Sequence, residues 1–184
     1  MPLGSLDLLP ALDHPELLAD PVFALLSTLP PTLAASVGVA AIDPDLADTA
    51  AFCEAYDVGL DVSANCVIVA GTRGEVTKYA ACMVLATTRL DVNGVVRRLL
   101  DARKASFAPM DDAVASTGME YGGITPIGIP ADWFLFVDSR IPALGDVVIG
   151  AGIRAAKIVL PGALLAELPN AQVIDGLAKE IPAD

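Results

Sequence analysis

The stretch Ser116-Thr117-Gly118-Met119-Glu120-Tyr121-Gly122-Gly123-Ile124-Thr125-Pro126-Ile127-Gly128-Ile129-Pro130 carries four glycines and two prolines. Neither a helix nor a central strand accepts such a run, because glycine frees the backbone and proline removes a hydrogen-bond donor. A loop of this composition is stiff and has exposed N–H groups, which suit it to hold an oxygen atom or a carbonyl group. Composition alone is equally compatible with a rigid surface turn and with a binding loop.

The overall composition indicates one domain with a substantial core. The chain has 184 residues, of which 54% are hydrophobic, and its mean hydropathy of +0.60 argues against disorder. The net charge of −12 is uneven, since residues 1–72 hold ten acidic and no basic residues. An anionic partner should therefore meet the later part of the chain, and nucleic-acid binding should be local and weak. The basic residues there include Arg73, Arg97, Arg98, Arg103, Lys104, Arg154 and Lys157.

The residues with redox or metal chemistry are few. Cys53, Cys66 and Cys82 lie in apolar surroundings without CxxC spacing, which predicts reduced core thiols in a cytoplasmic protein. His14 is the only histidine, so a site with several histidine ligands is excluded. Its place beside Pro15 at a helix start predicts a capping or surface role and not a catalytic one. No apolar run reaches the length of a membrane span, so we expect no membrane partner.

Hydrophobic patterning predicts a helical arm over residues 1–35, packed on a domain formed by residues 36–184. The apolar runs 66–70 and 79–86 predict a hairpin whose strands are buried on both faces. Further strands are predicted at 37–42, 134–138, 146–149 and 172–174, and helices at 46–56, 92–102, 111–116 and 163–168. Helices and strands are interspersed without strict βαβ alternation. We therefore expect a single α/β domain with a mixed, barrel-like β-sheet surrounded by helices.

A second motif competes with the glycine-rich loop. Residues 147–155 read as a strand followed by GxGxxA, with Asp175 downstream, as in a dinucleotide-binding fingerprint. The crossover helix of such a unit would have to pass through Pro161-Gly162, and a proline inside a helix costs about 3 kcal/mol. We therefore treat a nucleotide fold as the less favoured alternative.

Residues 45–178 resemble, in order, the YbaK/ProX-type aminoacyl-tRNA editing deacylases, which are related to the editing domain of bacterial prolyl-tRNA synthetases. The resemblance rests chiefly on Thr117-Gly118 followed by Gly122-Gly123-Ile124-Thr125-Pro126, and then on the segment from Gly150 to Arg154. It implies hydrolysis of the ester between an amino acid and the tRNA 3′ end, by a cytoplasmic protein without metal or other cofactor. It also implies the aminoacyl-tRNA 3′ end as a weakly bound partner, with an aminoacyl-tRNA synthetase as a further one, and it does not involve DNA.

The chemistry of ester hydrolysis suggests the site residues. An activated ester needs a placed water molecule and donors aimed at the developing oxyanion. We expect Gly122, Gly123 and Ile124 to supply these donors through their N–H groups, and alanine at either glycine to abolish function with little effect on the fold. Substrate-binding roles are expected for Gly118, Thr125, Pro126, Asp138, Gly150, Gly152, Arg154 and Lys157.

The chain departs from the family at one position. Members carry a substrate-contacting lysine at the start of the first long strand, and here Asn65 occupies that place. Asparagine donates hydrogen bonds but carries no charge. Asn65 therefore leaves three alternatives open: a deacylase with weakened editing that retains Asn65 in its catalytic site, a deacylase with a different substrate, or a catalytically silent member that binds an aminoacyl-nucleotide or another small ligand. Asn65 is equally compatible with a purely structural role at the start of the strand. Arg154 and Lys157 could partly restore the positive charge.

Overall fold

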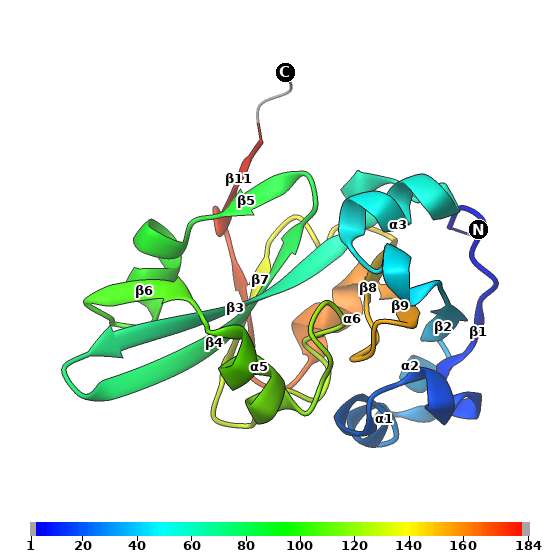
Figure 1. The fold of residues 1–184 in the computed structure, drawn as a ribbon, viewed down its shortest axis with the longest axis horizontal. Coiled ribbons are helices and arrows are strands. Elements are labelled where there is room, and N and C mark those ends of the chain that lie inside the picture. Colours follow the sequence, from blue (N-terminus) through cyan, green and yellow to red (C-terminus); the bar gives the residue numbers. More distant parts are fainter. Residues whose placement is uncertain (1–2, 182–184) are drawn as a thin grey trace.

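The computed structural model describes residues 3–181 and has two main β-sheets flanked by short helices (Figure 1). The larger sheet has the strand order β10-β7-β4-β3-β6, formed by β3 (Ala64–Arg73), β4 (Val76–Leu85), β6 (Lys104–Phe107), β7 (Phe134–Asp138) and β10 (Ala171–Ile174). The smaller sheet has the order β1-β2-β9-β8, formed by β1 (Leu9–Pro10), β2 (Gly38–Ala41), β8 (Asp146–Gly150) and β9 (Ala156–Pro161). A separate pair joins β5 (Thr88–Leu90) to β11 (Ala178–Glu180).

The predicted mixed α/β class is confirmed, but the barrel-like closure is not. Strands β4, β7 and β10 pair in parallel, whereas the other pairs are antiparallel. Within residues 3–181, the backbone pairing between the two main sheets is a single bridge, Ser63 to Val148. The sheets therefore lie beside each other without forming one closed barrel.

The β3–β4 hairpin is the longest ladder of the fold and confirms the sequence prediction. Its two-residue turn begins with Gly74 at φ 62°, the left-handed conformation that a type II′ turn requires at this position. Side chains alternate along β4, so that Ala81, Met83 and Leu85 enter the main core. Ala80, Cys82 and Val84 enter a second core on the other face of the sheet. The apolar run is continuous because both faces are covered.

The helices predicted at 46–56 and 92–102 are shorter than expected, whereas those predicted at 111–116 and 163–168 agree with the structure to within one residue at each end. The helices are α1 (Asp20–Leu26), α2 (Pro31–Ala34), α3 (Thr49–Tyr56), α4 (Arg97–Leu99), α5 (Met110–Thr117) and α6 (Gly162–Glu167), with 3-10 turns at Ala11–Asp13, Pro15–Leu17, Pro44–Leu46 and Leu60–Val62. The helix expected over 92–102 is instead a π-helical turn, Val92–Val96, followed by the single turn α4. Asp91 caps it as expected, accepting a hydrogen bond from the Gly94 N–H at 2.8 Å.

The segment 1–35, which was expected to form a helical arm, contributes a strand and core side chains to the domain within its described residues. Strand β1 pairs with β2, and Val22 and Leu26 are fully buried in the main core. A third cluster forms around Phe52, which places α3 against the smaller sheet.

No helix within residues 3–181 has the length and apolar content needed to cross a membrane.

Candidate functional site

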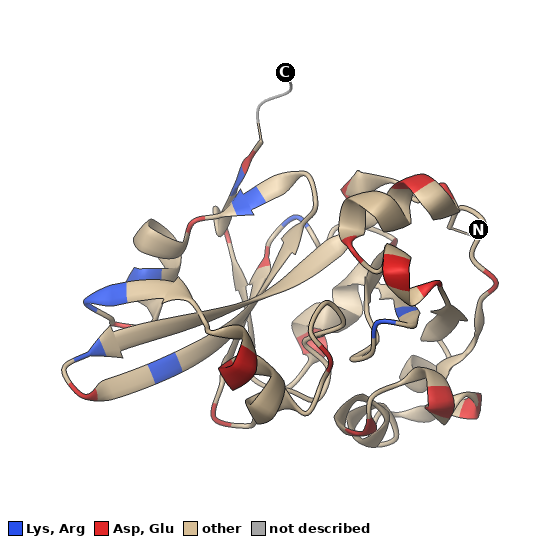
Figure 2. Cartoon of the chain, viewed as in Figure 1, with Lys and Arg blue, Asp and Glu red and all other residues tan. Residues whose placement is uncertain are grey.

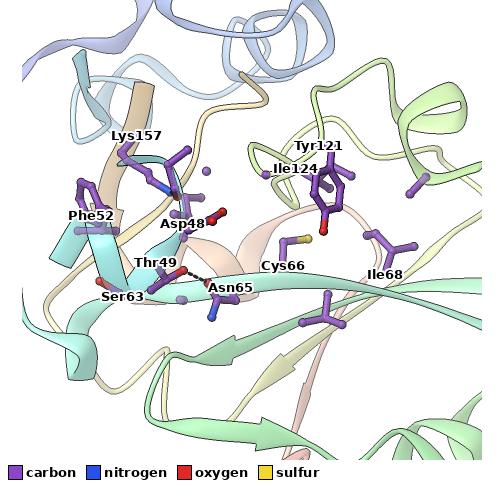
Figure 3. Close-up of a pocket in the computed structure, with 18 of the residues that line it drawn as sticks. Asp48, Thr49, Phe52, Ser63, Asn65, Cys66, Ile68, Tyr121, Ile124 and Lys157 are labelled. Atoms are coloured by element: carbon purple, nitrogen blue, oxygen red, sulfur yellow. Dashed lines mark hydrogen bonds between the residues drawn. The ribbon is translucent and has the colours of Figure 1, made fainter. Parts of the chain in front are cut away.

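A cavity of about 480 Å³ lies where the start of β3 meets α3, the glycine-rich loop and the smaller sheet (Figure 3). Of the predicted site residues, five line it: Asn65, Gly122, Ile124, Gly150 and Lys157. These residues are up to 92 positions apart in the chain. The fold therefore brings together the loop after α5, the end of β8, β9 and the first residues of β3.

The glycine-rich loop begins where α5 ends. Gly118 terminates that helix at φ 66°, and a tight turn follows in which the Gly123 N–H donates to the Glu120 carbonyl at 2.9 Å. Gly122 is the third residue of this turn and has φ 83°. A type II turn requires a positive φ at its third residue, and glycine adopts it without strain.

The loop packs backbone to backbone against the turn between β8 and β9. The Gly152 N–H donates to the Gly123 carbonyl at 2.8 Å, and the Glu120 N–H donates to the Gly152 carbonyl at 2.8 Å. A β-carbon on Gly123 would lie 2.6–2.8 Å from backbone atoms of Ile153, and one on Gly150 would lie 2.5 Å from the Gly123 carbonyl oxygen. Glycine is required at both positions because the two segments touch.

This contact also explains the dinucleotide-like motif. Gly150, Ala151 and Gly152 follow β8 and lead into the antiparallel strand β9, so no crossover helix follows them. The dinucleotide reading is therefore wrong, and the glycines serve close packing against the loop.

Of the three loop N–H groups predicted to act as donors, one is already used within the loop. The Gly123 N–H is consumed by the Glu120 carbonyl, which corrects its expected role as an oxyanion donor. Across the described chain, the N–H groups of Gly122 and Ile124 donate to no protein acceptor. Both residues line the cavity.

The first half of β3 supplies a second set of backbone groups. Strand β6 pairs with β3 only over Val69 to Thr72, so Ala64 to Ile68 form a largely unpaired edge beside the cavity. The Ile68 carbonyl points to this edge, where it accepts from the Ala108 N–H at 2.9 Å. Alternate residues of an extended strand direct their N–H and C=O groups to the same side. The peptide groups of Cys66 therefore point toward the cavity.

Asn65 lies on the opposite face of β3 from Cys66, as Figure 3 shows. Its side-chain oxygen accepts a hydrogen bond from the Thr49 hydroxyl at 2.6 Å, which fixes the amide beside the first turn of α3. Asn65 is half-buried and contributes to the lining, so it is not a core residue. Its NH₂ group remains as the donor.

Lys157 brings a positive charge to the cavity from the opposite wall. It is only 8% exposed, its Nζ donates to the Ala47 carbonyl at 2.9 Å, and the ammonium lies 5.1 Å from the centre of the Phe52 ring. Burial lowers the pKa of Lys157, and the nearby charge of Asp48 opposes that shift only in part. The sequence analysis expected a substrate-binding role for Lys157, but nothing in the strand pattern reveals that its side chain is buried against Phe52.

The other reactive side chains of the cavity are less suited to chemistry. Burial raises the pKa of the Cys66 thiol to about 12, so it is not a thiolate nucleophile near neutral pH. All three cysteines are free, and within residues 3–181 no group of three or more His, Cys, Asp or Glu side chains is placed to hold a metal ion. His14 lies in the N-terminal segment, where its Nδ1 contacts Glu16 at 2.9 Å.

Arg154 links two segments beside the cavity through hydrogen bonds. Its guanidinium donates to the Pro44 carbonyl at 3.0 and 3.2 Å and to the Tyr121 carbonyl at 3.4 Å, while its backbone N–H donates to Glu120 at 2.7 Å. The side chain therefore ties the segment before α3 to the glycine-rich loop. This use of its donors leaves less of Arg154 for a substrate than its sequence position suggested.

The remaining predicted residues do not line the cavity. Gly118 and Gly152 shape the loop and its supporting turn, and Thr125 and Pro126 are buried behind it. The Thr125 hydroxyl is fully buried, and no partner for it exists among the described residues.

Asp138 belongs to a different part of the molecule. It is 1% exposed, and its carboxylate accepts from Arg140 at 2.8 and 2.9 Å and from the Ala178 N–H at 3.1 Å. Burial alone would raise the pKa of Asp138, but these hydrogen bonds outweigh it and hold the pKa below its usual value. The expected substrate-binding role is not supported by this placement, because the carboxylate is used to anchor the C-terminal strand.

Several lining residues were not anticipated from the sequence. Thr49, Phe52, Cys66, Tyr121 and Val148 all border the cavity, and they come from segments whose patterns predicted only helix, strand or loop. Tyr121 alone had a signal, since a large aromatic residue inside a glycine-rich loop has no local core to join. It is 60% exposed.

Comparison with known proteins gives one family and a common fold. The model of a family described as the aminoacyl-tRNA editing domain matches residues 43–168, more than two thirds of the chain. The crystal structure of a candidate trans-editing enzyme for prolyl-tRNA synthetase is 21% identical, with a TM-score of 0.72 over 88% of this chain and 96% of that one.

Two further solved structures share the fold. A protein from a study of epitope backbone grafting onto scaffold proteins is 22% identical, with a TM-score of 0.72 over 88% of this chain and 97% of its own. A hypothetical protein is 20% identical, with a TM-score of 0.67 over 77% of this chain and 90% of its own. No curated protein matches the chain.

Proposed function

The chain belongs to the aminoacyl-tRNA editing domain family, and from that premise we propose that it is a trans-acting aminoacyl-tRNA deacylase. The substrate is the ester that joins an amino acid to the 3′-terminal ribose of a mischarged tRNA. The likeness to the candidate trans-editing enzyme supports an aminoacyl-tRNA synthetase as the enzyme whose errors are removed. The observation that carries the proposal is the cavity, in which hydrogen-bond donors and one ammonium group surround a half-enclosed space.

The chemistry requires little from the side chains. Water attacks the carbonyl carbon, the carbonyl oxygen becomes negative, and the C–O bond to the ribose then breaks as the ribose oxygen takes up a proton. The barrier falls when donors are already aimed at the oxygen that becomes charged. The N–H groups of Gly122, Ile124 and Cys66 are the backbone donors at this cavity. Because the cavity contains no histidine, the ribose hydroxyl beside the ester serves to place the water.

We assign to Lys157 the cationic role that the family lysine has at the position of Asn65. Lys157 faces the cavity from β9, and in the described part of the chain no carboxylate lies within salt-bridge distance of its ammonium. A charge-assisted hydrogen bond is about twice as strong as a neutral one. An ammonium in a half-enclosed cavity is therefore an effective partner for the developing oxyanion or for the terminal phosphate.

One observation favours a second function, a binding protein without turnover. Asn65 has its oxygen engaged by Thr49 and lies on the other face of β3 from Cys66, so it does not reproduce a lysine that reaches into the cavity. If Lys157 does not replace that lysine, the same cavity would hold an aminoacyl-nucleotide or a similar small ligand without hydrolysing it.

The two functions separate in a deacylation screen. A panel of mischarged tRNAs is incubated with wild type, Lys157→Met and Asn65→Lys, and ester loss is followed at substrate-limiting conditions. The deacylase proposal predicts hydrolysis of at least one ester by wild type and a loss of at least tenfold in Lys157→Met. Binding of an aminoacyl-adenosine analogue without hydrolysis of any panel member would establish the silent binder instead.

A further inference from the structure

The molecule has one basic end on an otherwise acidic surface. Residues 64–107 contain seven of the eleven Lys and Arg residues but only three of the 23 acidic ones, which gives them a formal charge of +4 in a chain of −12. Figure 2 shows most of these bases around the tip of the β3–β4 hairpin, β6 and α4, while Arg89 lies apart from them on β5. Acidic residues predominate around the helices of the N-terminal part. Opposite charges are thus separated along the molecule.

The bases at this end line a groove, which we call the basic groove. It has a volume of about 600 Å³, and its polar walls are formed by Thr72, Asn93, Arg97, Arg103, Lys104 and Ser106. No carboxylate lines it, and in residues 3–181 no salt bridge reaches its three cations. The nearby Arg73 differs, because its guanidinium is paired with Asp101 at 2.6 Å. The groove therefore presents unneutralised charge.

Two strands connect the basic groove to the cavity. Along β3, Ala64 to Ile68 line the cavity, while Ala70 and Thr72 line the groove. Along β6, Lys104 to Ser106 line the groove, and the next residue, Phe107, lines the cavity. The seven residues from Cys66 to Thr72 span about 20 Å of extended chain, because each of the six steps between them adds about 3.3 Å. A linear polymer with its end bound in the cavity would therefore reach the groove with a unit only a few positions from that end.

Exposed large side chains line the cavity, and one of them, Phe107, directly follows the groove residue Ser106. Phe107 is 66% exposed, Tyr121 is 60% exposed and Met110 is 50% exposed, and all three line the cavity. Large side chains are usually buried, so their exposure at one mouth is a signal of binding. Aromatic faces beside a positive groove are the combination that holds single-stranded nucleic acid, by stacking of bases and neutralisation of phosphates.

We propose that the basic groove binds the backbone phosphates of the single-stranded 3′ segment of tRNA, with Phe107 as a stacking surface between groove and cavity. The identity of the group in the cavity rests on the proposed function. A flat anionic surface such as a membrane fits less well, because residues outside 64–107 carry a formal charge of −16 and would be repelled by it. A single-stranded nucleic acid can lie within the groove, away from the negatively charged remainder of the surface.

The test measures binding of deacylated tRNA to the full-length chain as a function of salt. The groove variant is Arg103→Gln/Lys104→Gln, and its matched control is Arg89→Gln/Lys179→Gln, which removes the same charge from the β5–β11 pair. For single strands each phosphate contact adds about 0.7 to the slope of log K against log salt. The groove variant should lose about 1.4 of that slope and bind about tenfold more weakly at low salt, whereas the control should stay within about twofold of wild type. Phe107→Ala should weaken binding about tenfold with an unchanged slope.

A minimal substrate separates this inference from the proposed function. An aminoacyl ester of adenosine fills only the cavity, so the groove variant should hydrolyse it like wild type while its KM for aminoacyl-tRNA rises. If no ester is hydrolysed but the groove variant alone loses tRNA binding, the deacylase proposal fails, whereas the inference that the basic groove binds tRNA is supported. Equal loss in groove and control variants would show a net-charge effect and overturn the inference. Binding to vesicles containing phosphatidylserine, with none to tRNA, would also overturn it and identify a membrane surface.

Discussion

Gly123→Ala tests the contact on which the geometry of the cavity depends. The new β-carbon would lie 2.6–2.8 Å from three backbone atoms of Ile153, closer than real β-carbons approach such atoms. Backbone cannot swing aside as a flexible side chain can, so the glycine-rich loop and the β8–β9 turn must separate. These contacts therefore contradict our sequence-based expectation that alanine at Gly123 leaves the fold nearly intact.

The expected loss in the free energy of unfolding follows from the hydrogen bonds between the glycine-rich loop and the β8–β9 turn. Separation stretches the Gly152–Gly123 and Glu120–Gly152 hydrogen bonds, both 2.8 Å, and the 2.7 Å bond from the Arg154 N–H to Glu120. Each contributes about 0.5–1.5 kcal/mol net. With some loss of packing, we expect Gly123→Ala to lower the free energy of unfolding by about 3 kcal/mol. Hydrolysis should fall with it, because Gly122 and Ile124 lose their positions.

Neighbouring glycines provide the controls. At Gly122 the β-carbon would meet only the end of the Arg154 side chain, which can move, so alanine there should cost about 1–2 kcal/mol, mostly from its φ of 83°. Gly118 has φ 66° with open space around it and measures the conformational cost alone, and Gly145 is exposed with neither constraint. Urea unfolding should rank the losses Gly123, Gly122, Gly118, Gly145. If Gly123→Ala is no less stable than Gly118→Ala, the loop and turn are not in contact in solution, and the geometry argued for the cavity is wrong.

Three further predictions follow from buried polar groups. Thr125→Val should raise the free energy of unfolding by about 1 kcal/mol in urea titrations, because it removes a buried hydroxyl without a partner; a loss of stability would mean that the hydroxyl is bonded in solution. Asp138→Asn should cost about 2–4 kcal/mol, since it breaks a buried pair with a partly exposed arginine. Because the folded pKa of Asp138 is depressed, its contribution is present above the unfolded value of about 3.9 and disappears as the pH falls through the folded pKa; the difference between wild type and variant should shrink on acidification. Lys157→Met should abolish most activity but change stability by less than about 1 kcal/mol at neutral pH. Since burial lowers the folded pKa of Lys157, the penalty on its charged form vanishes as the pH rises toward the unfolded value of about 10.4, and wild type should gain stability relative to Lys157→Met over that rise.

The parts of the fold that local rules determine could be predicted from the sequence. The β3–β4 hairpin was visible because its strands are buried on both faces, and the Asp91 cap was visible because an acidic residue precedes an apolar run. The helix over 92–102 was predicted too long. Asn93 and Gly94 lie in the first turn after the cap. Their low helix propensity accompanies a π-helical turn and one turn of α-helix, where the amphipathic pattern suggested three turns.

The candidate site was predicted in part, for a reason that lies in its contacts. The glycine-rich loop carried its own signal, because its composition excludes helix and strand. Its partner, the turn from Gly150 to Arg154, was more ambiguous, since the same glycines fit a nucleotide fingerprint until their close approach to Gly123 is known. The absence of closure between the sheets could not be predicted either, because it depends on pairings between strands far apart in the chain.

Lys157 shows how physical inconsistency can mark a site. Of the two charged side chains buried in the described residues, Asp138 has a bidentate arginine partner, whereas Lys157 has only a carbonyl and an aromatic ring. Its neighbours along β9 are Ala156, Ile158, Val159 and Leu160, so an aliphatic residue at 157 would satisfy the fold at no desolvation cost. Positions that break a local rule without a structural gain tend to be functional. Under the proposed function, we therefore interpret Lys157 as supplying, from a different strand of the same cavity, the positive charge that the family resemblance predicts at Asn65.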